Sequence, residues 1–225
     1  MLFDYPATTR VERVIPKTAI YQHAELKPAV KRALVDEVEK ITWRHKLSPD
    51  TLNIAASPQP TEIQVFELHP KQCEAFNTAD TPISEAVLRS IDKAMPTAVI
   101  FEIRCTRGWQ VMAAYKESLE NCITSLGSYF YTAWLSPDST RQPLPITLNM
   151  QTLYHSLLAP LLPHPVRVGE SMKQASNRMT EIHSLEKKLE QLHARLRQEP
   201  QFNRKIAINA EIRDQQQQLN RLLEI

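Results

Sequence analysis

Two acidic residues, Asp50 at the predicted turn 48–50 and Glu62 further along the chain, have types and spacing that suit a divalent-metal site. Restriction-type nucleases place one acid on the second strand of their core and an acid-x-lysine on the third. The carboxylates hold Mg²⁺ or Mn²⁺ while the lysine polarises the attack. Asp50 lies just before a predicted second strand, and Glu62-Ile63-Gln64 opens a predicted third strand, but no lysine follows Glu62 there. A metal-dependent nuclease with a degenerate motif, built on Asp50, Glu62 and Gln64, is therefore an alternative hypothesis.

Other polar residues lie within predicted strands or near their ends. Strand alternation would place Glu67, Glu102 and Arg104 on one face of a sheet, and a structural ion-pair cluster is a simpler interpretation of them than an active site. Cys73 follows His69 by four residues, but no second pair occurs at ligand spacing. We therefore expect no catalytic residues, no metal and no cofactor, with Mg²⁺ or Mn²⁺ needed only under the nuclease hypothesis.

The composition argues against nucleotide-binding enzymes and against a secreted or membrane-spanning protein. Only three glycines occur, none spaced to cradle a phosphate, so a P-loop or dinucleotide fingerprint is absent. Three widely separated cysteines are more typical of a reducing cytosol than of a disulfide framework. The N-terminus has no signal-peptide pattern, and the longest apolar stretch is too short to span a bilayer. We expect a cytoplasmic protein with no membrane partner.

The charge balance argues against a strongly basic nucleic-acid-binding domain. The 225 residues include 27 basic and 25 acidic side chains, which gives a net charge of +2 and no long run of cations. A site for nucleic acid would therefore have to be a local patch of basic residues. A DNA-binding adaptor that uses Lys46, Arg104, Arg107 and Arg204 is a third hypothesis.

The elements that must position these residues follow from hydrophobic periodicity. Four-residue spacing predicts helices over residues 25–40, 83–95 and 148–162. Strands are predicted over residues 41–47, 51–56, 62–69, 98–105, 109–116 and 129–135, and residues 1–24 are predicted to be irregular and extended. This order predicts an α+β fold over residues 1–165, with a mixed β-sheet flanked by helices. Prolines near residue 165 indicate a boundary.

Residues 166–225 contain few apolar residues, which recur at helical spacing, and Pro200 interrupts this pattern. If the chain turns near Pro200, facing residues have numbers that sum to about 400. With this sum, four apolar residues of the first helix are each paired with an apolar residue of the second, but Leu185 is paired with Gln215. The spacing therefore predicts an antiparallel two-helix coiled-coil hairpin, packed on its own domain or presented to another protein. Its predicted seam consists of Met179, Ile182, Leu189, Leu192, Ile208, Ile212, Leu219 and Leu222.

Three stretches, ITWRHKLSPDTLNI, SIDKAMPTAVIFEI and QFNRKIAINAEI, resemble the bacterial domain-of-unknown-function family numbered 4391. The resemblance runs over nearly the whole chain in the same order. That family is uncharacterised, so no catalytic residue carries over. Its members tend to be encoded beside Swi/Snf-type helicases and DNA methyltransferases in antiviral defence neighbourhoods. The resemblance implies an accessory subunit of a restriction-like system. The matching residues are Trp43, Lys46, Leu47, Ile91, Asp92, Lys93, Pro96, Phe202, Asn203, Arg204, Lys205 and Asn209.

The run Phe202-Asn203-Arg204-Lys205 follows the predicted turn and has two interpretations. Phe202 would cover Leu196 and Asn203 would cap the helix, or the four residues would bind a partner or phosphate. We expect a non-catalytic assembly subunit of a bacterial anti-phage, restriction-like system. Its partners would be a helicase, a DNA methyltransferase or both, with DNA reached through the complex.

Overall fold

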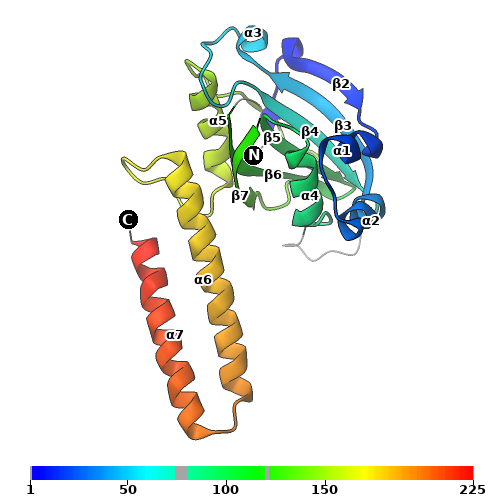
Figure 1. The fold of residues 1–225 in the computed structure, drawn as a ribbon. Helices are drawn as coiled ribbons and strands as arrows, with labels where there is room; N and C mark the ends of the chain where they lie inside the picture. Colours follow the sequence, from blue (N-terminus) through cyan, green and yellow to red (C-terminus); the bar gives the residue numbers. More distant parts are fainter. Residues whose placement is uncertain (1, 74–80, 120–121, 225) are drawn as a thin grey trace. The chain divides into compact units, whose positions relative to one another are not determined.

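The computed structural model describes residues 2–73, 81–119 and 122–224 (Figure 1). The chain divides into two compact units, Met1–Leu162 and Pro163–Ile225. The first unit is α+β with a mixed six-stranded sheet, and the second is a pair of helices. The predicted α+β class is confirmed.

The six-stranded sheet has the order β2-β3-β4-β5-β6-β7. Within this sheet β4 and β5 run parallel, and α4 lies between them in the chain, as is usual for a parallel connection. Every other neighbouring pair is antiparallel. A separate two-stranded sheet pairs β1 with β8. The strands are β1 (Phe3–Asp4), β2 (Arg10–Val14), β3 (Val38–Leu47), β4 (Ile63–Pro70), β5 (Ala98–Cys105), β6 (Gly108–Leu119), β7 (Cys122–Tyr131) and β8 (Gln142–Pro143).

Helices cover both faces of this sheet. Apolar residues of α1, α2 and α4 form one buried core with alternate residues of β3 to β6. Tyr154 of α5 stacks on Tyr115, which points to the opposite face from Ala114 of that core. The central strands β4 and β5 are therefore buried on both sides. The helices of this unit are α1 (Lys17–His23), α2 (Pro28–Glu37), α3 (Pro49–Leu52), α4 (Glu85–Lys93) and α5 (Met150–Leu158).

The first predicted helix is too long at both ends. Helix α2 begins at Pro28, where a missing amide hydrogen costs little, and ends at Glu37. Val38 continues the four-residue apolar spacing, but it adopts extended geometry and starts β3. Val38 is buried in the core that the helices share with the sheet.

Three other assignments from the sequence are wrong. Residues 51–56 do not form a strand, because Ser48 caps the short helix α3 with Thr51. Residues 1–24 are not irregular, since they contain β1, β2 and α1. Strand β7 begins at Cys122 rather than at residue 129, and Leu135 pairs with Trp109 beyond its end.

The cysteine prediction is also corrected. Cys73, which follows β4, forms a disulfide bond with Cys105 at the end of β5. Their Cα atoms are 5.6 Å apart, which is usual for such a bond. Because the two strands lie side by side, residues far apart in the sequence meet. Cys122 is a free, exposed thiol.

The second unit contains α6 (Met172–Gln198) and α7 (Phe202–Leu223), which lie side by side in opposite directions (Figure 1). Ser171 and Gln174 form a capping box that starts α6, and Pro200 lies between the helices. An ion pair of 3.4 Å joins Lys188 to Glu211 across the pair. The predicted helix pair is therefore present. Buried residues between the helices include Leu185, Leu189, Leu192, Ile208, Gln215 and Leu219.

The open end of this helix pair is closed by Arg167. Its guanidinium donates to the carbonyl oxygen of Leu222 at 2.7 Å and also to that of Glu224. The last carbonyls of a helix have no partner within it, so the arginine satisfies them. In the described part of the chain, none of the helices has the length and apolar character needed to cross a membrane.

Candidate functional site

Two buried carboxylates lie side by side in the centre of the large sheet. Glu67 of β4 and Glu102 of β5 are paired in register, and their residues are only 3% and 2% exposed. Arg104 lies 3.8 Å from Glu67, so the three residues share a face, as strand alternation predicts. Two adjacent buried carboxylates need cations or protons, because unpaired charge is costly away from water.

Arginines supply those cations. Arg141 donates two bonds to Glu102, at 2.9 and 2.7 Å, in the forked geometry that carboxylates favour. Arg44 approaches Glu67 to 3.5 Å, and the His69 Nε2 atom lies 2.5 Å from its other oxygen.

Arg44 also lies 3.4 Å from Glu12, so each carboxylate of the cluster already has a cationic partner, which makes the cluster unsuitable for a divalent cation. The same arginines affect His45: burial is the main cause that lowers its pKa to about 4, and Arg44 and Arg141 lower it further. A metal ion brought to this face would meet a similar repulsion. Among the described residues, no group of three or more His, Cys, Asp or Glu side chains is placed to hold a metal. The cluster is best interpreted as a structural ion-pair network.

The residues of the nuclease hypothesis meet only in part. Glu62 accepts a hydrogen bond from Gln64 at 3.0 Å and pairs with Lys46 of the neighbouring strand at 2.6 Å. Lys46 faces Gln64 in the β3–β4 register, a pairing that sequence spacing alone does not predict. Asp50 lies in the first turn of α3, where a negative charge interacts favourably with the positive end of the helix dipole. Among the described residues, no hydrogen bond or ion pair joins Asp50 to Glu62.

A second buried ion pair was not predicted from the sequence. Lys116 of β6 contacts the carboxylate of Asp92 of α4, and the two side chains are 1% and 0% exposed. The Lys116 ammonium also donates to the carbonyl oxygens of Asp92, Met95 and Thr97, at 2.8, 3.0 and 2.8 Å. Tyr129 donates to Asp92 at 2.6 Å. The group is closed to solvent and holds the end of α4 against the sheet.

The pKa values of this pair are dominated by burial. Burial raises the pKa of Asp92, although the adjacent ammonium opposes the shift. Burial lowers the pKa of Lys116, although the carboxylate opposes that shift. A lysine that directly follows the apolar run 111–115 was the signal in the sequence, but its partner lies 24 residues away.

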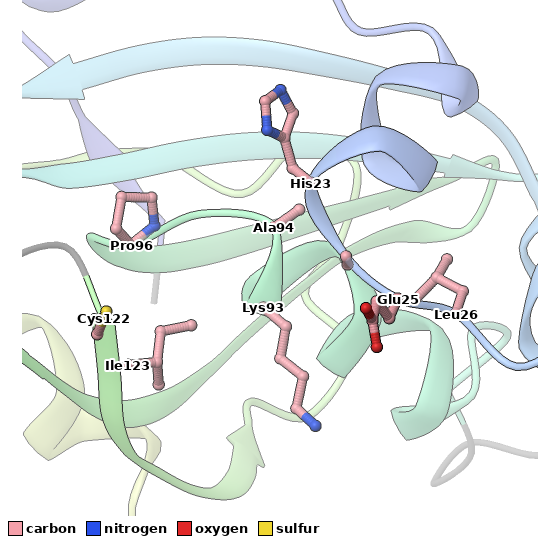
Figure 2. Close-up of a pocket in the computed structure, with 9 residues that line it drawn as sticks. His23, Glu25, Leu26, Lys93, Ala94, Pro96, Cys122 and Ile123 are labelled. Carbon is pink, nitrogen blue, oxygen red and sulfur yellow. The ribbon is translucent and has the colours of Figure 1, made fainter.

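A pocket of about 580 Å³ lies beside the end of α4 (Figure 2). Its lining combines the α1–α2 connection, the end of α4 and the start of β7, including His23, Glu25, Lys93 and Cys122. Figure 2 shows that the His23 ring and the Lys93 ammonium extend in opposite directions. The polar groups do not converge on one point, so the pocket has no arrangement typical of a catalytic site.

The cations of the DNA-adaptor hypothesis are found in different surroundings. Arg104 lies over the ring of Trp109 at 5.0 Å, and Arg107 lies over Trp134 at 4.3 Å. Lys46 pairs with Glu62. Arg204 belongs to the second unit and is exposed. The arginines and the lysine of the first unit therefore already have contacts within it.

The run at 202–205 forms the first turn of α7 and the residue after it. Phe202 is 74% exposed, so it does not bury itself against Leu196. Asn203 is not the helix cap, because that position belongs to Gln201, whose side chain makes no capping bond. Ile206, one turn further along α7, is 52% exposed. The interpretation of this run as a closed turn is wrong, and its side chains are accessible.

One comparison with known protein families gives a match over most of the chain. No curated protein and no solved structure matches the chain. The sequence matches the family described as Domain of unknown function (DUF4391) over residues 3–219, and the chain belongs to that family.

Proposed function

We propose that the protein is a non-catalytic assembly subunit that binds another protein through its C-terminal helix pair. The exposure of Phe202 and Ile206, one helical turn apart on α7, carries this proposal. Large exposed apolar side chains that adjoin each other on a helix commonly mark protein-binding surfaces. Aromatic residues in particular contribute much of the binding energy at such surfaces.

In this proposal α6 and α7 pack as an antiparallel coiled-coil hairpin. The spacing of the apolar residues supports it, and so does the Lys188–Glu211 ion pair, whose numbers sum to 399. A two-helix seam uses one narrow face of each helix. The opposite faces then remain available for a partner.

The first unit has a structural role in the proposal. The two buried ion-pair networks, around Glu67 and Glu102 and around Asp92 and Lys116, consist of groups that bind each other. Such groups stabilise a fold and are not free to bind a substrate. The proposed partners are a helicase, a DNA methyltransferase or both, in a bacterial anti-phage, restriction-like system in the cytoplasm. The family resemblance supports these partners, and DNA would be reached through them.

Co-purification tests this function. The tagged full chain is expressed with each helicase and methyltransferase encoded beside its gene, and a stable complex is expected. Phe202→Glu with Ile206→Glu should abolish the complex, because carboxylates cannot occupy an apolar interface. Ile146→Glu is a matched control, since Ile146 is a fully exposed apolar residue of the other unit.

Two results would contradict the proposal. One is that no neighbouring product associates with the wild-type chain. The other is that purified protein cleaves plasmid DNA with Mg²⁺ or Mn²⁺ and that Glu62→Ala abolishes the cleavage, which would establish the nuclease alternative.

A further inference from the structure

The tip of the helix pair, residues 195–206, combines exposed apolar groups with uncompensated positive charge. Arg195 and Arg197 lie in the last turn of α6, and Arg204 and Lys205 lie at the start of α7. The tip has a single acidic residue, Glu199, whose carboxylate accepts a hydrogen bond from the backbone N–H of Gln201 at 3.0 Å. Within the described residues, none of these four cations takes part in an ion pair.

Two of these cations occupy unfavourable positions. The start of a helix carries the positive end of its dipole, which disfavours cations, and the first turn of α7 has no acidic residue. Arg204 is in that turn and Lys205 follows it. Residues that face each other across the pair have numbers that sum to about 400, as Lys188 and Glu211 do. By this sum Arg195 and Lys205 lie at corresponding positions of α6 and α7, and nearby like charges repel each other.

We propose that the tip binds a protein surface in which Asp and Glu side chains surround an apolar pocket that receives Phe202. This inference rests on the proposed function and names the chemistry of the partner. Carboxylates at the rim would neutralise Arg195, Arg204 and Lys205, which removes the repulsion present in the free protein. Burial of the Phe202 ring, 74% exposed in the free chain, would supply the anchor.

The same observations disfavour two other occupants. A second copy of the chain would bring an equally positive tip against the first, and the charges would repel. A nucleic-acid duplex would neutralise the cations through its phosphates, but its bases are stacked inside, so it offers no apolar pocket for Phe202 and Ile206. An acidic protein surface with an apolar centre satisfies both features.

A peptide-display library of random sequence is a probe that requires no known partner. Selection on the wild-type full chain, with removal of peptides that bind the support alone, should enrich Asp and Glu beside Phe, Leu or Trp. Phe202→Ala should weaken a selected peptide at least about tenfold, as expected for a central anchor. Arg195→Glu with Arg204→Glu should weaken it similarly at low salt and less at high salt. Arg213→Glu, the same charge reversal further along α7, should leave binding unchanged.

Several outcomes would overturn this inference. Selected peptides without acidic enrichment would do so, as would peptide binding that Phe202→Ala leaves unchanged. Binding of a DNA duplex that needs Arg195 and Arg204 but not Phe202 would identify a nucleic-acid surface. A dimer in sedimentation experiments that Phe202→Ala dissociates would identify a second copy as the occupant.

The inference and the proposed function fail in different ways. If neighbouring gene products still co-purify with Phe202→Ala and with Arg195→Glu/Arg204→Glu, the assembly role stands but this tip chemistry is wrong. If acidic peptides bind the tip while no neighbouring product associates, the defence-system role is wrong and the tip chemistry stands. Circular dichroism of each variant checks that the helices remain folded.

Discussion

Replacement of Lys116 by Met removes the cation of a fully buried ion pair while it keeps most of the side-chain volume. The Asp92 carboxylate would then lie in the core without its counter-ion, and only Tyr129 would donate to it. The carbonyl oxygens of Asp92, Met95 and Thr97 would also lose their donor. Breaking one side of a buried pair costs about 3–5 kcal/mol, so we expect Lys116→Met to lower the free energy of unfolding by that amount.

The geometry predicts that the two partners are not equivalent. The ammonium has three hydrogens and three carbonyl acceptors, so Asp92→Asn leaves it with acceptors. The amide oxygen that this substitution introduces would still accept from Tyr129. We therefore expect Asp92→Asn to cost only about 1–2 kcal/mol, the range for a changed hydrogen bond. Lys93→Met, which alters an exposed lysine of the same helix, should stay within about 0.5 kcal/mol of wild type.

Urea unfolding followed by tryptophan fluorescence measures these differences. Trp43, Trp109 and Trp134 all lie in the first unit, so the signal reports on that unit alone. With a slope of about 2 kcal/mol per molar urea, Lys116→Met should lower the midpoint by roughly 2 M. A loss below about 1 kcal/mol would refute the reasoning. So would an equal loss in Asp92→Asn, because the carbonyl contacts would then not account for the asymmetry.

Three further perturbations follow from particular contacts. Hydrogen bonds from Arg178 lower the pKa of Glu170 from 4.5 to about 2, so its stabilisation is complete above pH 4.5 and disappears as the pH falls towards 2. Helix unfolding followed by circular dichroism against pH should show the difference between wild type and Glu170→Gln vanish over that range. Cys73→Ser with Cys105→Ser should lower stability by about 3–4 kcal/mol under oxidising conditions, as expected for a loop of this length, and abolish the effect of dithiothreitol on the unfolding midpoint. Gly108→Ala should cost at least about 2 kcal/mol in the same urea assay, because the residue has φ of +142° and an added Cβ would overlap a neighbouring carbonyl oxygen.

Periodicity predicts the buried core of this fold better than it predicts the edges. The strand at 98–105 was located to the residue, because its first four residues are apolar and both its faces are buried. The first seven residues of β7 were missed, because Cys122–Ser128 is rich in small polar residues and lies at an edge with half-exposed side chains. Local capping also overrides composition: Ser48 and Thr51 form a helix where β-propensity indicated a strand.

The polar clusters depend on strand order, which one sequence does not reveal. Glu67 meets Glu102 because β4 and β5 are parallel neighbours, and alternation sufficed to place both on one face. Arg141 reaches Glu102 from 39 residues away, through a segment outside the large sheet, and no spacing rule predicts that contact. The disulfide bond between Cys73 and Cys105 arises from the same adjacency of β4 and β5.

Charged side chains have different surroundings in the two units. In the first unit Asp92, Lys116, Glu67 and Glu102 are buried, and each forms an ion pair within the unit. At the tip of the helix pair the opposite holds, because the cations have no ion-pair partner among the described residues and Phe202 is exposed. Interaction free energy that is not used within the chain is available for a complex. A partner should therefore be sought at the tip rather than at the buried clusters, whose substitution changes stability before it changes binding.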